Sequence, residues 1–248
     1  MKYLIVGASS GLGRELAYKF ARENKNLIII SRDERDLVAI KSDLEIKYNI
    51  TVNYINLDFS SIDEINNKLL SQEQLLKDLQ GMLFPVGLMF DQDDAKLDSK
   101  KIEKLIYTNF VSITYCIQKL SKYFEGKNNP SIIGFGSVSG LLGRGINTTY
   151  AGSKRALESY FESLSFDKNF KETNIQFYIL GYLDTNLSFG KDLKLPKGSI
   201  SKLSDIVFKN INISFKKTVY PYYWNFISFV LKILPFYLIH KFSKILSK

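Results

Sequence analysis

Residues 3–13 read Tyr3-Leu4-Ile5-Val6-Gly7-Ala8-Ser9-Ser10-Gly11-Leu12-Gly13, and this stretch decides how the chain is interpreted. The first four residues predict a short buried strand, and the amphipathic residues 12–23 predict a helix. Glycines between them allow a tight turn and let backbone N–H groups approach a ligand closely, and the helix N-terminus adds partial positive charge. A plain turn between a strand and a helix is the alternative. We predict a pyrophosphate-binding loop formed by Gly7, Ser9, Ser10, Gly11, Leu12 and Gly13.

The rest of the chain continues this alternation of short apolar runs and longer amphipathic stretches. Strands are predicted at 3–6, 27–30, 52–55, 82–84, 132–135 and 175–180. Helices are predicted near 12–23, 34–48, 61–70, 99–122 and 149–169. Nearly continuous apolar strands that alternate with helices are typical of a parallel sheet covered on both faces. We therefore predict an α/β fold with a Rossmann-like, doubly wound parallel sheet: a single domain, residues 1–205, followed by an amphipathic helical C-terminal extension, residues 206–248.

The composition is that of an ordinary globular protein, with 248 residues, 45% of them hydrophobic and 24% charged. One cysteine and one histidine exclude a disulfide framework and give no basis for a metal site. The first apolar run is too short for a signal peptide, so we expect a cytoplasmic protein. Residues 206–248 hold seven lysines and no Asp or Glu, which leaves only +2 of the net charge of +9 for the rest. This distribution does not indicate a nucleic-acid-binding surface.

The glycine spacing of Gly7, Gly11 and Gly13 resembles the nucleotide-binding loop of the short-chain dehydrogenase/reductase family. The second strand ends in Ser31 and Arg32, where enzymes that use NAD usually place an acidic side chain. A hydroxyl and a guanidinium suit a 2′-phosphate, so NADP(H) is favoured over NAD(H). The alternative is that Arg32 is a solvated loop charge.

Four residues in the second half of the chain form a candidate catalytic set. Tyr150 and Lys154 stand one helical turn apart, and a lysine ammonium near a tyrosine is expected to lower its pKa from about 10. Ser137 ends a buried strand, at the sheet edge where ligands bind. The family resemblance implies that Ser137 binds the substrate oxygen and Tyr150 transfers the proton. It also implies that Lys154 binds the nicotinamide ribose and that Asn109 completes a water-linked proton relay.

The resemblance covers about residues 1–190 and assigns further cofactor contacts to Asp58, Gly87 and Thr185. Asp58 matches an aspartate that contacts the adenine ring, although a turn or N-cap role explains it equally well. Gly87 is what is left of the family's Asn-Asn-Ala-Gly motif. Thr185 follows a Leu-Gly pair in place of Pro-Gly, and it sits where a threonine binds the nicotinamide carboxamide. These departures predict a divergent subgroup with an intact reacting set.

Residues 221–239 are aromatic and apolar, with apolar side chains at helical spacing. Polar or helix-breaking residues at 225, 232 and 235 argue against a transmembrane span. One interpretation is a peripheral membrane contact through residues 221–248, at the inner face of the cell membrane. The other is packing on the protein as a pocket lid or a subunit contact. The tail is similar to those of short-chain reductases of bacterial cell-envelope assembly, which implies a lipid-linked or sugar substrate.

The function predicted is that of an NAD(P)H-dependent oxidoreductase that reduces a carbonyl, or oxidises an alcohol, on a small-molecule substrate. Tyr150 is its expected general acid and base. The alternative is a non-catalytic NADP(H)-binding sensor or scaffold that the tail recruits to membranes, although such a protein has no need for Ser137, Tyr150 and Lys154. The family commonly pairs through the helices that hold Asn109 and Tyr150, so a homo-oligomer is expected by analogy.

Overall fold

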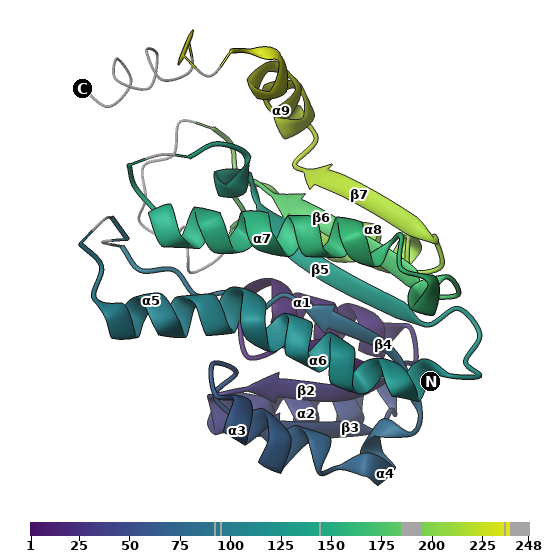
Figure 1. Cartoon of the computed structure of the whole chain (residues 1–248). Helices are drawn as coiled ribbons and strands as arrows, with labels where there is room; N and C mark the ends of the chain where they lie inside the picture. The colour runs from purple at the N-terminus through teal and green to yellow at the C-terminus, as the bar shows by residue number, and fades with distance from the viewer. Residues whose placement is uncertain (92, 95, 144, 185–194, 236, 239–248) are drawn as a thin grey trace.

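The computed structural model describes the chain except for residues 92, 95, 144, 185–194, 236 and 239–248. In the described part, seven strands form one parallel sheet in the order β3-β2-β1-β4-β5-β6-β7 (Figure 1). The strands are β1 Lys2–Val6, β2 Asn26–Ser31, β3 Val52–Asn56, β4 Leu79–Phe84, β5 Ser131–Ser137, β6 Asn174–Leu180 and β7 Phe215–Tyr220. The strand order reverses between β1 and β4, which creates a binding crevice at the carboxyl edge of the sheet. The predicted Rossmann-like α/β sheet is confirmed.

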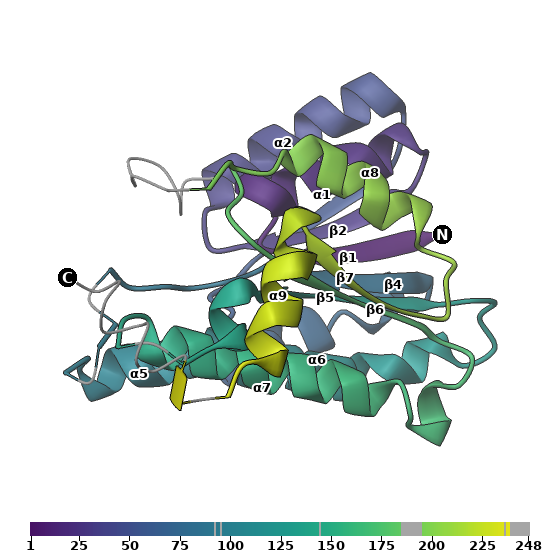
Figure 2. The same cartoon turned by 90° about the horizontal axis from the view of Figure 1, so that it is seen from above.

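Helices cover both faces of this sheet (Figure 2). One face carries α1 (Gly11–Arg22), α2 (Glu34–Tyr48) and α8 (Ile200–Lys209). The opposite face carries α5 (Ser99–Ile106), α6 (Ser112–Leu120) and α7 (Thr148–Leu164). The short helices α3 (Ile62–Glu64) and α4 (Glu73–Leu76) precede β4, and α9 (Tyr223–Ile233) follows β7. None of the helices in the described ranges has both the length and the hydropathy that crossing a bilayer requires.

Two π-helical segments interrupt stretches that the sequence predicts as continuous α-helices. The stretch predicted over 99–122 consists of α5, a π-helical turn at Tyr107–Val111 and α6. The stretch predicted over 61–70 consists of α3 and a π-helical turn at Ile65–Leu70. Such turns carry one extra residue per hydrogen-bonded ring and are frequent at functional sites. The first of them contains Asn109.

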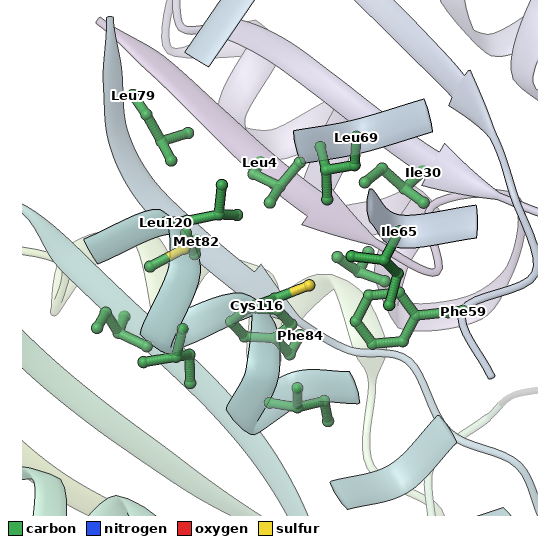
Figure 3. Packing of buried hydrophobic residues seen from close by; sticks show 14 of the residues in the cluster. Leu4, Ile30, Phe59, Ile65, Leu69, Leu79, Met82, Phe84, Cys116 and Leu120 are labelled. Carbon is green, nitrogen blue, oxygen red and sulfur yellow. The ribbon is translucent and has the colours of Figure 1, made fainter. Parts of the chain in front are cut away.

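Alternating strand residues build one hydrophobic layer on each face of the sheet. Leu4 belongs to the layer under α6, whereas Tyr3 and Ile5 belong to the layer under α1, as the period of two in a strand requires. In the first layer, Cys116 of α6 lies against Phe84 of β4 (Figure 3). Burial of each such side chain contributes roughly 1.5–3 kcal/mol. Both layers end at the carboxyl edge of the strands, where the loops form the site.

The predicted domain boundary between residues 205 and 206 is wrong. It falls inside α8, and residues 215–220 of the predicted extension form β7, which pairs in parallel with β6. Two adjacent lysines in β7 hide the strand in the sequence pattern, because β7 is a sheet edge with a partly exposed side. The Lys217 ammonium pairs with Glu158 and with Glu162 of α7, the latter at 2.6 Å. These ion pairs let the charged Lys217 side chain lie between β7 and α7. Within the predicted extension, the helix α9 is the part that extends beyond the sheet (Figure 1).

Candidate active site

In the loop between β1 and α1, the backbone at Gly13 lies close against the backbone at Gly7. A Cβ atom on Gly13 would lie 2.0 Å from the Gly7 carbonyl oxygen, and Gly7 has a φ of +88°, so both positions require glycine. The N–H groups of Gly7 and Ala8 donate to the Ile30 carbonyl at 2.8 and 3.1 Å and fasten the loop to β2. Ser10 precedes α1 without a side-chain capping bond. The first N–H groups of α1 are therefore free to bind the phosphates of a nucleotide.

One cavity of about 520 Å³ extends from this loop along the carboxyl ends of the strands. Most of the predicted site residues line it, namely Gly7, Ser9, Ser10, Gly11, Leu12, Gly13, Ser31, Arg32, Asp58, Gly87, Ser137, Tyr150 and Lys154. Asn109 lies behind the wall of the cavity, fully buried. Thr185 lies outside the described residues. The fold thus brings the glycine loop and the candidate catalytic set into one space.

The end of β2 carries the residues predicted to select the cofactor. The Ser31 hydroxyl donates to the Ser9 hydroxyl at 2.8 Å, which joins β2 to the glycine loop. Arg32 is exposed at the cavity and has no ion-pair partner in the described part of the chain. This corner of the cavity therefore offers a phosphate group the Ser9 hydroxyl and a guanidinium that no described carboxylate pairs with.

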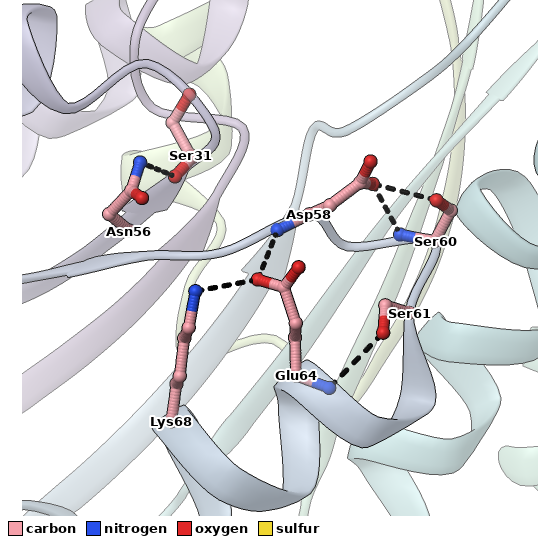
Figure 4. A network of polar contacts seen from close by, with 7 residues as sticks. All are labelled: Ser31, Asn56, Asp58, Ser60, Ser61, Glu64 and Lys68. Carbon is pink, nitrogen blue, oxygen red and sulfur yellow. Dashed lines mark hydrogen bonds and ion pairs between the residues drawn. The ribbon is translucent and has the colours of Figure 1, made fainter.

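Asp58 at the end of β3 is held in a polar network (Figure 4). Its Oδ1 accepts from the N–H and the hydroxyl of Ser60, and its Oδ2 accepts from Lys104 Nζ at 2.9 Å. Burial acts to raise the pKa of Asp58, but the hydrogen bonds from Lys104 and Ser60 together lower it to about 2. Both sequence interpretations therefore have a structural basis: Asp58 is a turn aspartate, and its side chain also lines the cavity.

Ser137, Tyr150 and Lys154 meet where β5 ends and α7 begins. Lys154 Nζ donates to the Phe135 carbonyl oxygen at 3.0 Å and lies 5.9 Å from the centroid of the Tyr150 ring. Burial lowers the pKa of Lys154 to about 8. Gly87 lies beside this group, since a Cβ there would be 3.5 Å from Lys154 Nζ.

The expectation that Lys154 lowers the pKa of Tyr150 is not met in this structure. Burial raises the pKa of the Tyr150 phenol, and a hydrogen bond with Ser137 only partly opposes that increase. The physical reason is that a phenolate loses its hydration in the cavity wall, while Lys154 is bonded to a carbonyl oxygen on β5. Tyr150 is therefore protonated at neutral pH, which is the form that a proton donor needs.

Asn109 connects the loop after β4 to α7 from outside the cavity. Its Oδ1 accepts from the Leu88 N–H at 2.7 Å, and its Nδ2 donates to the Leu88 carbonyl at 2.8 Å. Nδ2 also donates to Ser153 Oγ at 3.1 Å, and Ser153 Oγ donates to the Tyr150 carbonyl at 2.7 Å. Asn109 thus fixes the loop after β4 and contacts the helix of Tyr150. Its implied part in a water-linked proton relay stays a prediction.

Asp93 lies outside the cavity but contacts the helix of Tyr150, and it was not predicted from the sequence. Its carboxylate accepts from the N–H groups of Thr149 and Tyr150 at 3.0 and 2.7 Å, at the first turn of α7. The residue type of Asn147 points to a local helix cap instead. In the structure Asn147 has a φ of 56° and makes no side-chain capping bond. A local sequence pattern cannot identify a cap that comes from a distant loop.

The other half of the cavity is mainly apolar. Residues that the sequence did not single out supply this lining, namely Leu88, Met89, Val138, Ile146, Leu180, Tyr182 and Leu183. The charged side chains that line the cavity in the described part of the chain are those of Arg32, Asp58, Lys104 and Lys154. A substrate carbonyl beside Ser137 and Tyr150 would thus have an apolar environment for the groups attached to it.

Comparisons with known proteins agree with this geometry. A family model described as short chain dehydrogenase matches residues 2–193. The chain is 30% identical over 196 residues to a very-long-chain 3-oxoacyl-CoA reductase of the yeast Vanderwaltozyma polyspora, covering 74% of this chain and 55% of that protein. It is 26% identical over 242 residues to hydroxysteroid 11-beta-dehydrogenase 1-like protein A of Xenopus laevis, covering 93% of this chain and 80% of that protein. The chain therefore spans only about half the length of the yeast relative.

Solved structures share the fold at low sequence identity. A short-chain dehydrogenase from Sphingobium yanoikuyae in complex with NADPH has a TM-score of 0.80 and 20% identity, over 93% of each chain. A bulky-bulky ketone specific alcohol dehydrogenase from Comamonas testosteroni has a TM-score of 0.78 and 21% identity, over 93% of this chain and 92% of that one. With the family model covering most of the chain and the glycine loop and catalytic set in one cavity, the protein belongs to the short-chain dehydrogenase/reductase family of oxidoreductases.

Proposed function

We propose that this protein is an NADPH-dependent reductase of ketones that carry large apolar groups. The observation that carries the proposal is that Ser137, Tyr150 and Lys154 line one cavity together with the glycine loop, while most of the remaining wall is apolar. The first part of the lining suits a nicotinamide nucleotide, and the second part suits an apolar substrate. Alcohol oxidation is the reverse of the same reaction.

The proposed mechanism assigns one task to each residue of the set. The glycine loop, Gly7 to Gly13, would hold a nicotinamide nucleotide, whose chemistry would be hydride donation to the carbonyl carbon. The Ser137 hydroxyl donates a hydrogen bond to the carbonyl oxygen, and the Tyr150 phenol donates its proton to that oxygen as negative charge develops there. Lys154, with a pKa of about 8, is charged at neutral pH and stabilises the phenolate that Tyr150 becomes.

The preference for NADP(H) over NAD(H) rests on the corner formed by Ser9, Ser31 and Arg32. Ser9 and Ser31 are bonded to each other, and Arg32 has no ion-pair partner among the described residues. A 2′-phosphate would bind the guanidinium and the Ser9 hydroxyl, since the Ser31 hydroxyl already donates to Ser9, whereas a ribose hydroxyl would leave the guanidinium unused. The structural neighbour from Sphingobium yanoikuyae is itself a complex with NADPH, which supports the same choice.

The substrate class follows from the apolar wall and agrees with the names of similar proteins. These names refer to very-long-chain 3-oxoacyl-CoA, hydroxysteroids and bulky ketones. Each of them is a carbonyl or alcohol compound with a large apolar part. A lipid-linked keto compound of envelope biosynthesis fits the same wall, and the bacterial subgroup that the tail resembles stays a prediction.

We also propose that α9 attaches the protein peripherally to an anionic membrane surface. Four exposed side chains follow one another at helical spacing, namely Tyr222, Phe226, Phe229 and Ile233. On another side of α9, Trp224 packs against Tyr182 of the cavity wall, with 5.8 Å between the ring centroids. The lysine-rich, acid-free sequence of residues 206–248 suits anionic lipid. A cytoplasmic protein at the inner face of the membrane is the location that this implies, and homo-oligomerisation stays an expectation by analogy.

A substrate panel tests the proposed reaction. NADPH oxidation by the full-length protein would be measured with 3-oxoacyl thioesters, steroid ketones and bulky aryl ketones, and with small polar ketones as the contrast. We expect turnover of the bulky apolar ketones and little or none of the small polar ones. A protein that binds NADPH tightly and turns over no member of the panel would instead be a cofactor-binding sensor or scaffold.

A further inference from the structure

We infer that Asp93 is a positioning residue for Tyr150, because it supplies the N-cap of α7 from the loop after β4. This inference rests on the proposed function, in which Tyr150 donates the proton. It assigns a role in the reaction to a side chain that does not line the cavity. Asp93 reaches the reacting phenol only through the backbone of α7.

Four hydrogen bonds join Asp93 to the first turn of α7. The carboxylate accepts from the Tyr150 N–H at 2.7 Å, from the Thr149 N–H at 3.0 Å and from the Thr148 hydroxyl at 3.3 Å. The Asp93 carbonyl oxygen accepts from the Thr148 N–H at 3.1 Å. Asp93 is 2% exposed, so water does not compete freely for these bonds. The carboxylate also places negative charge at the positive end of the helix.

The cap replaces one that the helix does not supply itself. A local N-cap side chain would accept from the second or third N–H of the helix. In α7 these two N–H groups donate to the Asp93 carboxylate instead. Asn147, at the capping position, is in the left-handed region and makes no such bond. The first turn of α7, which contains Tyr150, is therefore held by a residue more than fifty positions away in the chain.

The loop after β4 is fixed at two points, and both lead to Tyr150. Asn109 holds Leu88 by two hydrogen bonds and contacts Ser153 of α7. Asp93 holds the first turn of α7 directly. Met89 lies between these points and lines the cavity. Asp93 thus sets the position of the proton donor relative to the wall that contacts the substrate, and a displacement of about 1 Å can cost roughly 100-fold in rate.

The experiment compares Asp93→Ala, Asp93→Asn and a matched control in the full-length protein. The control is Asp98→Ala, which removes another aspartate N-cap: Asp98 accepts from the Lys101 N–H at 3.0 Å at the start of α5. Amide hydrogen exchange of the peptide that contains Thr149 and Tyr150 measures the cap itself and needs no substrate. Turnover of a ketone that the wild type reduces, the KM for NADPH and the isotope effect with 4-deuterated NADPH measure its consequence.

We expect Asp93→Ala to speed exchange at Thr149 and Tyr150 and to lower kcat by roughly 100-fold with a nearly unchanged KM for NADPH. The isotope effect should rise, because the chemical step becomes slower than product release. The Asp93 carboxylate accepts through both oxygens, whereas asparagine has one acceptor oxygen, so Asp93→Asn should fall between wild type and Asp93→Ala in exchange and in kcat. Asp98→Ala should affect neither the exchange at Tyr150 nor kcat.

Two results would overturn the inference. Unchanged exchange at Thr149 and Tyr150 in Asp93→Ala would mean that Asp93 does not cap α7 in solution. Faster exchange with an unchanged kcat would mean that the cap has no part in positioning Tyr150. A wild-type protein without any turnover would instead contradict the proposed function, and is thus distinguishable from both.

Discussion

The ammonium nitrogen of Lys154 lies 5.9 Å from the centroid of the Tyr150 ring, one helical turn further along α7. Burial changes the two groups in opposite senses: it raises the pKa of the phenol and lowers the pKa of the ammonium to about 8. The phenol is therefore protonated at neutral pH, and the ammonium is close to the pH at which it loses its charge. The turnover of ketones and its dependence on pH should therefore report on Tyr150 and Lys154.

Replacement of Tyr150 by phenylalanine removes the proposed proton donor and leaves the ring. We expect Tyr150→Phe to lower kcat for ketone reduction by roughly 10²–10⁴-fold, since general acid catalysis contributes that much. The matched control is Tyr160→Phe, on the same helix, where Tyr160 packs edge-on against Phe110. Steady-state NADPH oxidation by both variants checks the prediction, and wild-type turnover by Tyr150→Phe would disprove the mechanism.

The charge of Lys154 predicts an alkaline limit to the reaction. Because burial lowers its pKa to about 8, Lys154 loses its proton as the pH rises through that value. We expect kcat/KM for NADPH, which reports groups of the free enzyme, to be level below this pH and to fall above it. The fall is expected to come from the loss of the charge that stabilises the phenolate.

The matched variant for this limit is Lys154→Arg. A guanidinium stays charged throughout the accessible range, so the decrease near pH 8 should disappear even if the absolute rate is lower. Profiles of kcat/KM against pH for the two proteins provide the comparison. An unchanged limb in Lys154→Arg would assign the titration to another group.

Arg32 is expected to decide which nicotinamide nucleotide binds. Loss of one charge-assisted contact to a 2′-phosphate costs about 1.5–3 kcal/mol, so Arg32→Ala should weaken NADPH binding by roughly 10- to 150-fold and leave NADH binding unchanged. Arg35→Ala is the control, because Arg35 is 94% exposed in its side chain and pairs weakly with Asp33. Fluorescence titration with both nucleotides measures the change. An equal loss for NADPH and NADH would contradict a role for Arg32 at the 2′-phosphate.

The parts of this structure that could be predicted from the sequence are those with a local cause. The buried strands have continuous apolar runs, and the spacing between Tyr150 and Lys154 places them on one helix face whatever surrounds them. β7 was missed because Lys217 within it is neutralised by two carboxylates of α7, which lie far away in sequence. Asp93 and the raised pKa of Tyr150 were missed for the same reason. A distant cap and the burial of a phenol depend on tertiary packing.

Gly181, at the end of β6, is predicted to be essential for the packing of α9. A Cβ there would lie 2.1 Å from Trp224 Nε1, so Gly181→Ala must displace the indole or the helix. We expect a loss of about 1–3 kcal/mol in the free energy of unfolding. Gly152→Ala is the contrasting variant, since open space surrounds that position in α7 and alanine favours a helix by about 1 kcal/mol. Urea unfolding compares them, and equal stability of Gly181→Ala and wild type would mean that Trp224 does not pack on β6 in solution.

The exposed stripe of α9, formed by Tyr222, Phe226, Phe229 and Ile233, is expected to bind anionic membranes. Phe226 and Phe229 are 72% and 61% exposed on this stripe, and burial of their rings in the lipid interface should drive binding together with the lysines of the tail. We expect the double variant Phe226→Ser, Phe229→Ser to lose co-sedimentation with phosphatidylglycerol-containing liposomes and to keep ketone reduction in solution. The control is Phe166→Ser, because Phe166 is 85% exposed but follows α7 rather than belonging to α9. Wild-type protein that stays in the supernatant at low salt would contradict the proposed membrane contact, whereas equal sedimentation of both serine variants would place the lipid contact elsewhere on the surface.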